Sequence, residues 1–260
     1  MPYTAPSREL LQHLEKARSV VVLTGAGVSA ESGIPTFRGQ GGLWREFRPE
    51  ELATAAAFEQ RPKLVWEWYM WRRQLVAQAE PNPGHFALAA LETKYSEFTL
   101  VTQNVDGLHM RAGSRNVIEL HGNIMRSRCH ECGSPAGEAA LDKDGQLPAC
   151  ECGGLIRPDV IWFGELLPPE ALKRAWEASA HAEVFLSIGT SSAVQPAAGL
   201  ADMAKRAGAY LVEVNPDTTE MSDRFDEVLR GPSSAILPTL CEELGLNISS
   251  TAMFSVQGIE

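Results

Sequence analysis

The chain has 260 residues, of which 44% are hydrophobic, so it can form one large α/β domain or one domain with a smaller insertion. It carries 23 basic and 33 acidic residues, a formal net charge of −10, and this acidity argues against a nucleic acid as a direct partner. The apolar runs are far shorter than the ~20 residues that a transmembrane helix needs, so we expect no membrane partner.

The predicted elements alternate along the chain. The spacing of apolar residues predicts helices over residues 7–18, 61–79, 84–95 and 196–207. Short β-branched or apolar runs predict strands over residues 19–24, 98–102, 117–120, 184–188 and 210–214. Strands that alternate with helices indicate an α/β fold with a Rossmann-like, doubly wound parallel sheet.

A change of composition indicates a second, smaller domain. Residues 123–158 contain four cysteines, several glycines and little apolar periodicity, which suits a metal-binding module better than part of the core. We expect this zinc-binding module to join a helical insertion at 37–82. The Rossmann-like domain is then expected to comprise residues 1–36, 83–122 and 159–247, followed by a loosely ordered polar C-terminal tail at 248–260.

A glycine-rich turn follows the first predicted strand. Residues Gly25 to Ala30 have the G-x-G-x-x-A spacing of a dinucleotide-binding turn, in the strand-to-helix context that this motif requires. Glycines let the backbone approach a pyrophosphate, although a tight structural turn is the alternative. Helix breakers at Ser32 to Pro35, and the glycines that follow, argue against a regular crossover helix. We therefore expect NAD, held differently than in a dehydrogenase.

Four of the five cysteines form two close pairs. Cys129 and Cys132 are separated by two residues, and Cys150 and Cys152, seventeen residues further on, by one. Four thiolates make a closed tetrahedral set, which predicts one structural zinc without an open coordination position. Two disulfides or a redox-active Cys-x-x-Cys are the alternatives, and His130 lies between the first two ligands.

The cysteine pattern also bears on location. Clustered cysteines favour metal binding in a reducing compartment over a disulfide framework. The first residues of the chain contain no apolar segment of the kind found in signal peptides. We therefore expect a cytoplasmic protein.

One of the six histidines stands out by its context. His121 follows the predicted strand 117–120 and precedes a glycine, which places it where strand ends border the ligand crevice of an open α/β sheet. A neutral imidazole there can act as a general base near neutral pH. The residues around His121 are equally compatible with a histidine that has only a structural role. For the other five histidines we prefer a role at the surface, in a helix cap or in helix packing; they are His13, His85, His109, His130 and His181.

Several segments, taken together, resemble one known family. Residues 25–39, GAGVSAESGIPTFRG, are similar to the cofactor-binding signature of the sirtuins, which are NAD-dependent protein lysine deacylases. Further sirtuin motifs follow in family order, namely TQNVDGLH at 102–109, ELHG at 119–122, GTSS at 189–192 and VNP at 214–216. These motifs cover most of residues 20–240, so the chain resembles the sirtuins along most of its length.

The resemblance implies that NAD is a consumed co-substrate and that the partners are acylated-lysine proteins or peptides. The acyl oxygen would displace nicotinamide, and the products would be free lysine and O-acyl-ADP-ribose. His121 would deprotonate a ribose hydroxyl, while Asn104 and Asp106 would hold the nicotinamide ribose. The other implied NAD contacts are Gly25, Ala26, Gly27, Ser29, Ala30, Glu31, Ile34, Phe37, Arg38, Trp44, Gln103, Val105, Gly189, Thr190, Ser191, Asn215, Pro216 and Ser233. The loop 38–44 would form a lid that excludes water.

A tyrosine and an arginine suggest which acyl group is removed. Tyr69 and Arg72 are three residues apart on a predicted helix and share one face. The pair looks like the mark of class III sirtuins, which remove succinyl, malonyl or glutaryl groups, and a guanidinium beside a hydroxyl suits a carboxylate. Arg73 would take this place if the helix register shifted by one, and a solvated arginine on an amphipathic helix is the other alternative.

Three other functions remain open at this point. An NAD-dependent protein ADP-ribosyltransferase would use the same site, but it would not need His121 as a base. A non-catalytic NAD-sensing or zinc-scaffold module would bind without releasing nicotinamide. A hydride-transferring dehydrogenase agrees least with the interrupted crossover.

Overall fold

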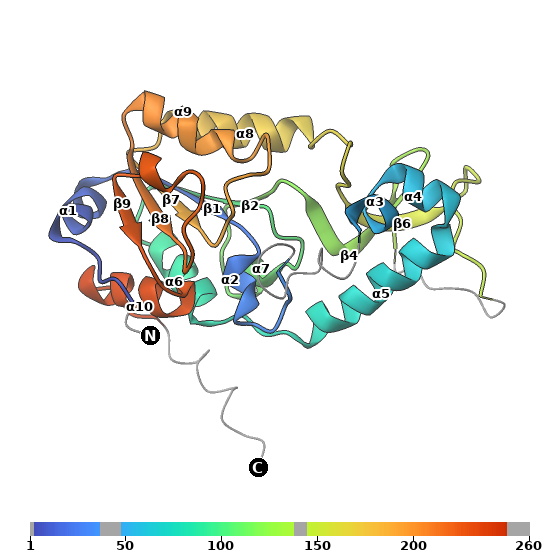
Figure 1. Ribbon diagram of the computed structural model, residues 1–260, viewed down its shortest axis with the longest axis horizontal. Coiled ribbons are helices and arrows are strands. Elements are labelled where there is room, and N and C mark those ends of the chain that lie inside the picture. The colour runs from blue at the N-terminus through green and yellow to red at the C-terminus, as the bar shows by residue number, and fades with distance from the viewer. Residues whose placement is uncertain (1–2, 37–47, 138–144, 249–260) are drawn as a thin grey trace, which may run out of the picture.

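A parallel sheet forms the larger part of the molecule in the computed structural model, which describes residues 3–36, 48–137 and 145–248. The six strands have the order β3-β2-β1-β7-β8-β9 (Figure 1). They are β1 (Ser19–Thr24), β2 (Glu97–Thr102), β3 (Val117–Glu119), β7 (Val184–Ile188), β8 (Tyr210–Val214) and β9 (Glu227–Leu229). The first five confirm the predicted strands, whereas the edge strand β9 was not predicted.

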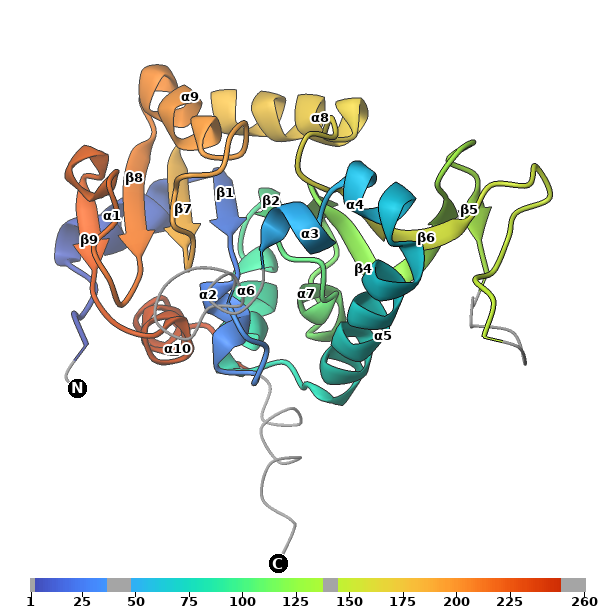
Figure 2. The same cartoon turned by 45° about the vertical axis from the view of Figure 1, so that its right-hand side comes forward.

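Helices cover both faces of this sheet (Figure 2). One face is covered by α1 (Arg8–Lys16), α6 (Pro83–Glu92) and α10 (Ser233–Glu243), and the other by α8 (Pro169–Ala180) and α9 (Gly199–Ala207). Successive residues of a strand point to opposite faces, so Val22 packs in the core beneath the first set and Val21 in the core beneath the second. Burial on both faces explains the uninterrupted apolar run of β1 and confirms the doubly wound fold.

The strand order places a crevice beside β1. Along the chain, the sheet grows outward from β1 through β2 to β3, and then from β7 through β8 to β9 on its other side. In such open sheets, ligands bind outside the carboxyl ends of the strands, where the order reverses. This position lies beyond Thr24 and Ile188, between β1 and β7.

A smaller part contains helices and an antiparallel sheet of order β5-β4-β6. Its elements are α3 (Pro49–Leu52), α4 (Ala55–Gln60), α5 (Pro62–Gln78), β4 (Gly122–Cys129), β5 (Pro135–Ala136) and β6 (Ile156–Val160). Its core joins Phe58, Val65 and Tyr69 with Ile124 and Trp162. The short helices α2 (Gly27–Ala30) and α7 (Leu108–Arg111) and the 3₁₀ helix η2 (Ser222–Arg224) complete the fold. The proposed domain limits stay a prediction, and β6 runs across the one at residue 158.

The predicted helices are present, but their buried residues or bounds differ in places. Helix α5 has Leu64 and Trp71 about two-fifths exposed, whereas Tyr69 and Arg72 on the adjoining face are buried. Tryptophans lie on several sides of this helix, so the spacing of its apolar residues did not indicate which face is buried. The helix predicted at 196–207 begins only at Gly199, and α10 continues through Pro238, which lies inside it.

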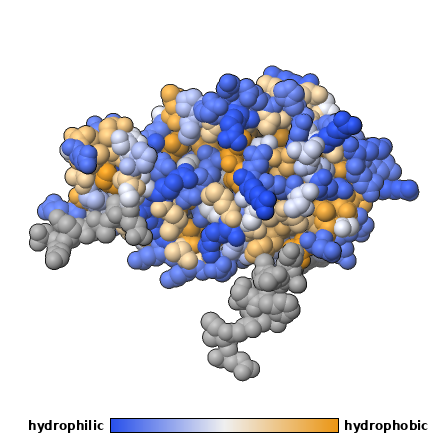
Figure 3. All heavy atoms as spheres, turned by 180° about the vertical axis from the view of Figure 1, so that it is seen from behind, coloured by the Kyte–Doolittle hydropathy of each residue, from blue (hydrophilic) through white to orange (hydrophobic). Residues whose placement is uncertain are grey.

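The surface of the described residues is mixed. The face in Figure 3 shows hydrophobic residues in small groups among hydrophilic ones. Among the described residues, no helix combines the length and the hydropathy that a membrane span requires. Leu166, shortly after β6, is the most exposed large hydrophobic side chain of this part of the chain, at 89%.

Candidate active site and metal centre

The predicted motifs meet because the loops that carry them leave the same edge of the sheet. The amide of Gly25 donates to the carbonyl of Ile188 at 3.0 Å, and the amide of Gln103 donates to that of Thr24 at 3.0 Å. The amide of Gly189 donates to the carbonyl of Val214 at 2.9 Å. The loops after β1, β2, β7 and β8 therefore lie side by side, in the crevice that the topology creates.

The glycines of this crevice serve close backbone packing. A Cβ on Gly25 or Gly27 would lie within 2.8 Å of the Gly189 carbonyl oxygen. Gly189 has φ +59°, and a Cβ there would lie 2.6 Å from the amide nitrogen of Val28. The two turns thus pack backbone against backbone, with no side chain between them. The interpretation of the motif as a pyrophosphate-binding turn did not include this requirement for glycine.

Ser29 is the centre of a buried polar network. Its hydroxyl donates to the Asp106 carboxylate at 2.8 Å and accepts from the Asn104 side-chain amide at 3.2 Å, while His85 Nε2 lies 3.4 Å away. The Leu108 amide also donates to Asp106 at 2.9 Å, and burial raises the pKa of that carboxyl above its usual range. The structure therefore brings together three predicted site residues and fixes the orientation of each.

The hydrogen bond of His121 determines its tautomer. Its Nδ1 lies 3.0 Å from the backbone carbonyl oxygen of Gln103. A carbonyl oxygen can only accept, so Nδ1 carries the proton, and in the neutral ring Nε2 is the basic nitrogen. Burial lowers the pKa of His121, and the bond to Gln103 offsets this in part. The ring is therefore neutral at physiological pH, as a general base requires.

Other predicted contacts lie around the same crevice. The Gln103 side chain donates to the Thr190 hydroxyl at 3.0 Å, and the Asn215 side chain donates to the Thr190 carbonyl at 2.9 Å. The Glu31 carboxylate accepts hydrogen bonds from the backbone amide and the hydroxyl of Ser234 at the start of α10. Ser233, another predicted contact, is buried next to it. Phe37, Arg38, Trp44 and the lid loop lie outside the described residues.

Two buried histidines beneath the site were expected only as packing or capping residues. His85 caps α6, since its Nδ1 accepts from the Asn82 amide at 3.3 Å. His109 Nε2 lies 2.9 Å from the Thr24 hydroxyl, which in turn donates to Thr102 at 2.8 Å. The rings of His85 and His109 are 4.8 Å apart, and burial lowers the pKa of both. Threonines ending two neighbouring strands are the sequence signal that could have indicated this network.

The predicted acyl-pocket residues lie together in the smaller part. Arg72 is 6% exposed, so the alternative of a solvated arginine is wrong, and its guanidinium carbon lies 4.9 Å from the Trp68 ring and 5.8 Å from the Tyr69 ring. Burial lowers the pKa of Arg72, while the nearby Tyr69 and Asp106 raise it. The Tyr69 hydroxyl accepts from Trp162 Nε1 at 2.8 Å. Sequence reasoning missed Trp162, which is 93 residues away in the chain.

The neighbouring arginine is engaged elsewhere. Arg73 donates to the Ile124 carbonyl at 2.5 Å and to the Ser127 hydroxyl at 2.8 Å, so its guanidinium is bound to β4. Arg72, not Arg73, is thus the arginine that shares the buried face with Tyr69.

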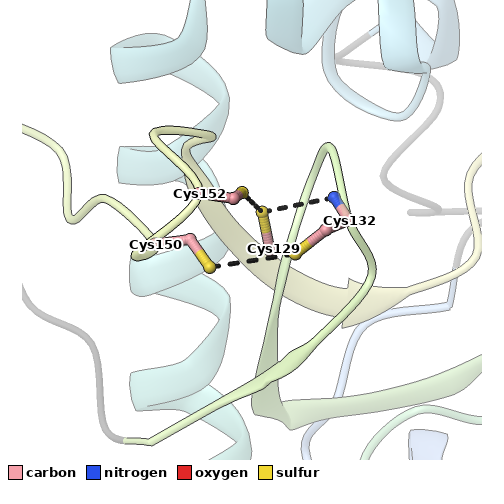
Figure 4. Close-up of side chains that lie close together, drawn as sticks. All are labelled: Cys129, Cys132, Cys150 and Cys152. Carbon is pink, nitrogen blue, oxygen red and sulfur yellow. Dashed lines mark hydrogen bonds between the residues drawn. The ribbon is translucent and has the colours of Figure 1, made fainter.

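The four predicted metal ligands converge at the end of β4, where Cys129 lies (Figure 4). Their sulfur atoms all lie within 4.8 Å of one another, with Cys129 and Cys152 at 3.5 Å and Cys132 and Cys150 at 3.8 Å. A tetrahedral zinc with bonds of about 2.3 Å would separate its sulfurs by about 3.8 Å. All five cysteines of the chain are free, so the alternative of two disulfides is wrong. The set fits a structural zinc.

His130 and Cys241 lie outside this ligand set. His130 Nε2 lies 3.4 Å from the Glu59 carboxylate, and its ring packs against Phe58 and Trp162. Cys241 is fully buried in α10 and packs in the core of the larger part.

Removal of the metal should unfold the zinc module. Cys129 ends β4 and is held by the pairing of that strand with β6, whereas Cys132, Cys150 and Cys152 lie in turns outside the named strands. Binding of a structural zinc can contribute on the order of 10 kcal/mol to folding. We expect one zinc per chain by elemental analysis and a lowered Tm after chelation or in a Cys150→Ser variant. Cys241→Ala, which changes a cysteine outside the set, should keep its zinc, and full metal content in Cys150→Ser would contradict the assignment.

Comparison with known proteins identifies relatives over nearly the whole chain. Residues 25–196 match the model of the Sir2 family. The "NAD-dependent protein deacylase" of Aquifex aeolicus is 58% identical over 80% of this chain and 87% of its own length. The "NAD-dependent protein deacylase 2" of Pyrobaculum aerophilum is 51% identical over 89% of this chain and 93% of its own.

Solved structures agree in fold as well as in sequence. A Sir2 homolog in complex with NAD superimposes with a TM-score of 0.86 at 45% identity, covering 94% of this chain and 96% of that one. A "Sir2-p53 peptide-NAD+" structure has a TM-score of 0.83 at 35% identity, covering 92% of this chain and 98% of that one.

Proposed function

This chain belongs to the Sir2 family, the sirtuins, and we propose that it is an NAD-dependent protein lysine deacylase that removes succinyl and malonyl groups in addition to acetyl groups. Deacylation of protein lysine with NAD follows from the family. The preference for acidic acyl groups is the finer proposal. The observation that carries it is the buried guanidinium of Arg72 on the same helix face as Tyr69.

The crevice between β1 and β7 would hold NAD. NAD supplies a ribose carbon that bears nicotinamide as a leaving group and accepts the acyl oxygen of the substrate lysine. The turns at Gly25, Gly27 and Gly189 pack against each other at this crevice, and Asn215 lies at the end of β8 beside them. One water would be consumed for each NAD and acyl-lysine, and the products would be nicotinamide, free lysine and O-acyl-ADP-ribose.

The proposed catalytic residues, Asn104, Asp106 and His121, would act on the nicotinamide ribose. Asn104 and Asp106 are held by Ser29 and by backbone amides, so they are oriented before NAD binds and need little reorganisation. His121 would take a proton on Nε2 from a ribose hydroxyl, while its Nδ1 proton stays bound to the carbonyl of Gln103. The three side chains come from the loops after β2 and β3, which are neighbouring strands.

The acyl chain would end at Arg72 and Tyr69. A guanidinium pairs with a carboxylate through charge-assisted hydrogen bonds, and the hydroxyl of Tyr69 lies on the same helix face. A carboxylate at the end of an acyl group can form these bonds, and the methyl of an acetyl group cannot. The buried surroundings strengthen this discrimination because the effective dielectric is lower than in water.

The test is a panel of peptides that carry acetyl, malonyl, succinyl or glutaryl lysine. The proposal expects the kcat/KM for malonyl and succinyl peptides to exceed that for the acetyl peptide of the same sequence, measured as lysine peptide released in the presence of NAD. An enzyme that hydrolyses only the acetyl peptide would still be a deacylase, but the finer proposal would be wrong.

A further inference from the structure

The indole of Trp162 controls the hydrogen bonding of Tyr69. Trp162 lies just after β6 and is 2% exposed, and its Nε1 donates to the Tyr69 hydroxyl oxygen at 2.8 Å. An indole N–H can only donate, so the tyrosine oxygen must be the acceptor in this bond. The hydroxyl proton of Tyr69 therefore points away from Trp162 and is free to be donated to another group.

The indole itself is held in one orientation. The guanidinium carbon of Arg157 lies 3.3 Å from the centroid of the Trp162 ring, and Arg157 is 1% exposed. Arg157 also donates to Glu165 at 2.9 Å, and the Glu165 carboxylate accepts from the backbone amide of Trp162 at 2.8 Å. The ring of Phe58 lies on another side, at 5.4 Å between centroids. These contacts prevent the ring from turning its N–H away from Tyr69.

A carboxylate and an acetyl methyl group would respond differently to this arrangement. An ionised carboxylate accepts hydrogen bonds only, so it needs a hydroxyl whose proton is not already committed. Without the Trp162 N–H, the Tyr69 hydroxyl can rotate, and part of its population donates elsewhere. An acetyl group ends in a methyl, which is indifferent to the direction of the O–H bond.

We propose that Trp162 is a positioning residue that favours acidic acyl groups by holding the Tyr69 hydroxyl as a donor toward the acyl carboxylate. This inference rests on the proposed function. It assigns to Trp162 an effect on acyl preference and not on the reaction common to all acyl groups.

The test compares Trp162→Phe with a matched control. Phenylalanine retains an aromatic ring between Arg157 and Phe58 but lacks the N–H. We expect kcat/KM for a succinyl peptide to fall about five-fold, mainly through KM, while that for the acetyl peptide changes less than about two-fold, as for the loss of one hydrogen bond. Trp66→Phe is the control, because Trp66 is fully buried and its Nε1 has no hydrogen-bond partner among the described residues. It should leave the succinyl-to-acetyl ratio unchanged.

A double-mutant cycle separates the proposed contact from a general loss of structure. Tyr69→Phe removes the hydroxyl and should lower the succinyl-to-acetyl ratio by itself. Adding Trp162→Phe to it should cause no further change in the ratio, because the contact is already gone. A further drop in the double variant, or an equal loss of both activities in Trp162→Phe, would overturn the inference.

The proposed function can fail separately from this inference. If Arg72→Met lowers the ratio while Trp162→Phe leaves it at the wild-type value, the pocket stands and the role of Trp162 is wrong. If neither variant changes the ratio, the acidic-acyl pocket itself is wrong, and the role of Trp162 falls with it.

Discussion

The Arg72→Met variant is expected to lose about 100-fold in kcat/KM for a succinyl-lysine peptide while it keeps most of its activity on the acetyl peptide. Arg72 is buried, so its bond to an acyl carboxylate would form away from water, where charge-assisted hydrogen bonds contribute the most. A contribution of about 3 kcal/mol corresponds to roughly 100-fold. Methionine keeps an unbranched apolar side chain at this buried position, so the helix should stay in place.

The adjacent arginine provides the matched control. Arg73→Met removes the bonds to Ile124 and Ser127 on β4, which should lower the Tm. It should not change the ratio of succinyl to acetyl activity, because Arg73 does not share the buried face with Tyr69. An equal loss of both activities in Arg72→Met would refute the pocket assignment.

The second large effect is expected at His121. His121→Ala should lower kcat by about 10² to 10⁴-fold with every acyl peptide, the range that general base catalysis contributes. NAD binding, followed by calorimetry, should change little, because most of the proposed NAD contacts lie on the loops after β1, β2, β7 and β8 and not on the loop that carries His121. His181 is an exposed histidine at the end of α8, just before β7 begins, and so lies at the edge of the sheet away from the crevice. His181→Ala should therefore leave kcat unchanged. A non-catalytic NAD-binding module would show no difference between the two variants.

The pH profile gives an independent check on His121. Only the neutral ring can accept a proton, and burial holds the pKa of His121 below its ordinary value of about 6.5. The rate should therefore be constant at neutral pH and fall only as the pH drops through this lowered pKa. A decline that begins on the alkaline side of pH 7 would assign the base to another group.

Much of the site could be predicted from the sequence because it depends on strand ends. Strands of four to six residues with turn residues after them were recognisable, and in a parallel sheet the loops after them must meet. The same is true of the cysteine set, in which spacing alone indicated the ligands. The bond between the Glu31 carboxylate and Ser234 at the start of α10 did not follow from the motif, because it joins segments 203 residues apart.

The remaining features depend on tertiary contacts that no local pattern encodes. Helix α5 is aromatic on all sides, so neither the burial of Arg72 nor the exposure of Trp71 followed from periodicity. The bond from Trp162 to Tyr69 joins two segments that are brought together only by the packing of α5 against β4 and β6. The interlocking of Gly27 with Gly189 likewise depends on β7 lying next to β1.

One measurement tests the central claim most directly: mass spectrometry of the products formed from NAD and a succinyl-lysine peptide. We expect one nicotinamide and one O-succinyl-ADP-ribose for each free lysine released. ADP-ribose attached to the peptide or to the enzyme, with the succinyl group still on lysine, would identify an ADP-ribosyltransferase and contradict the account.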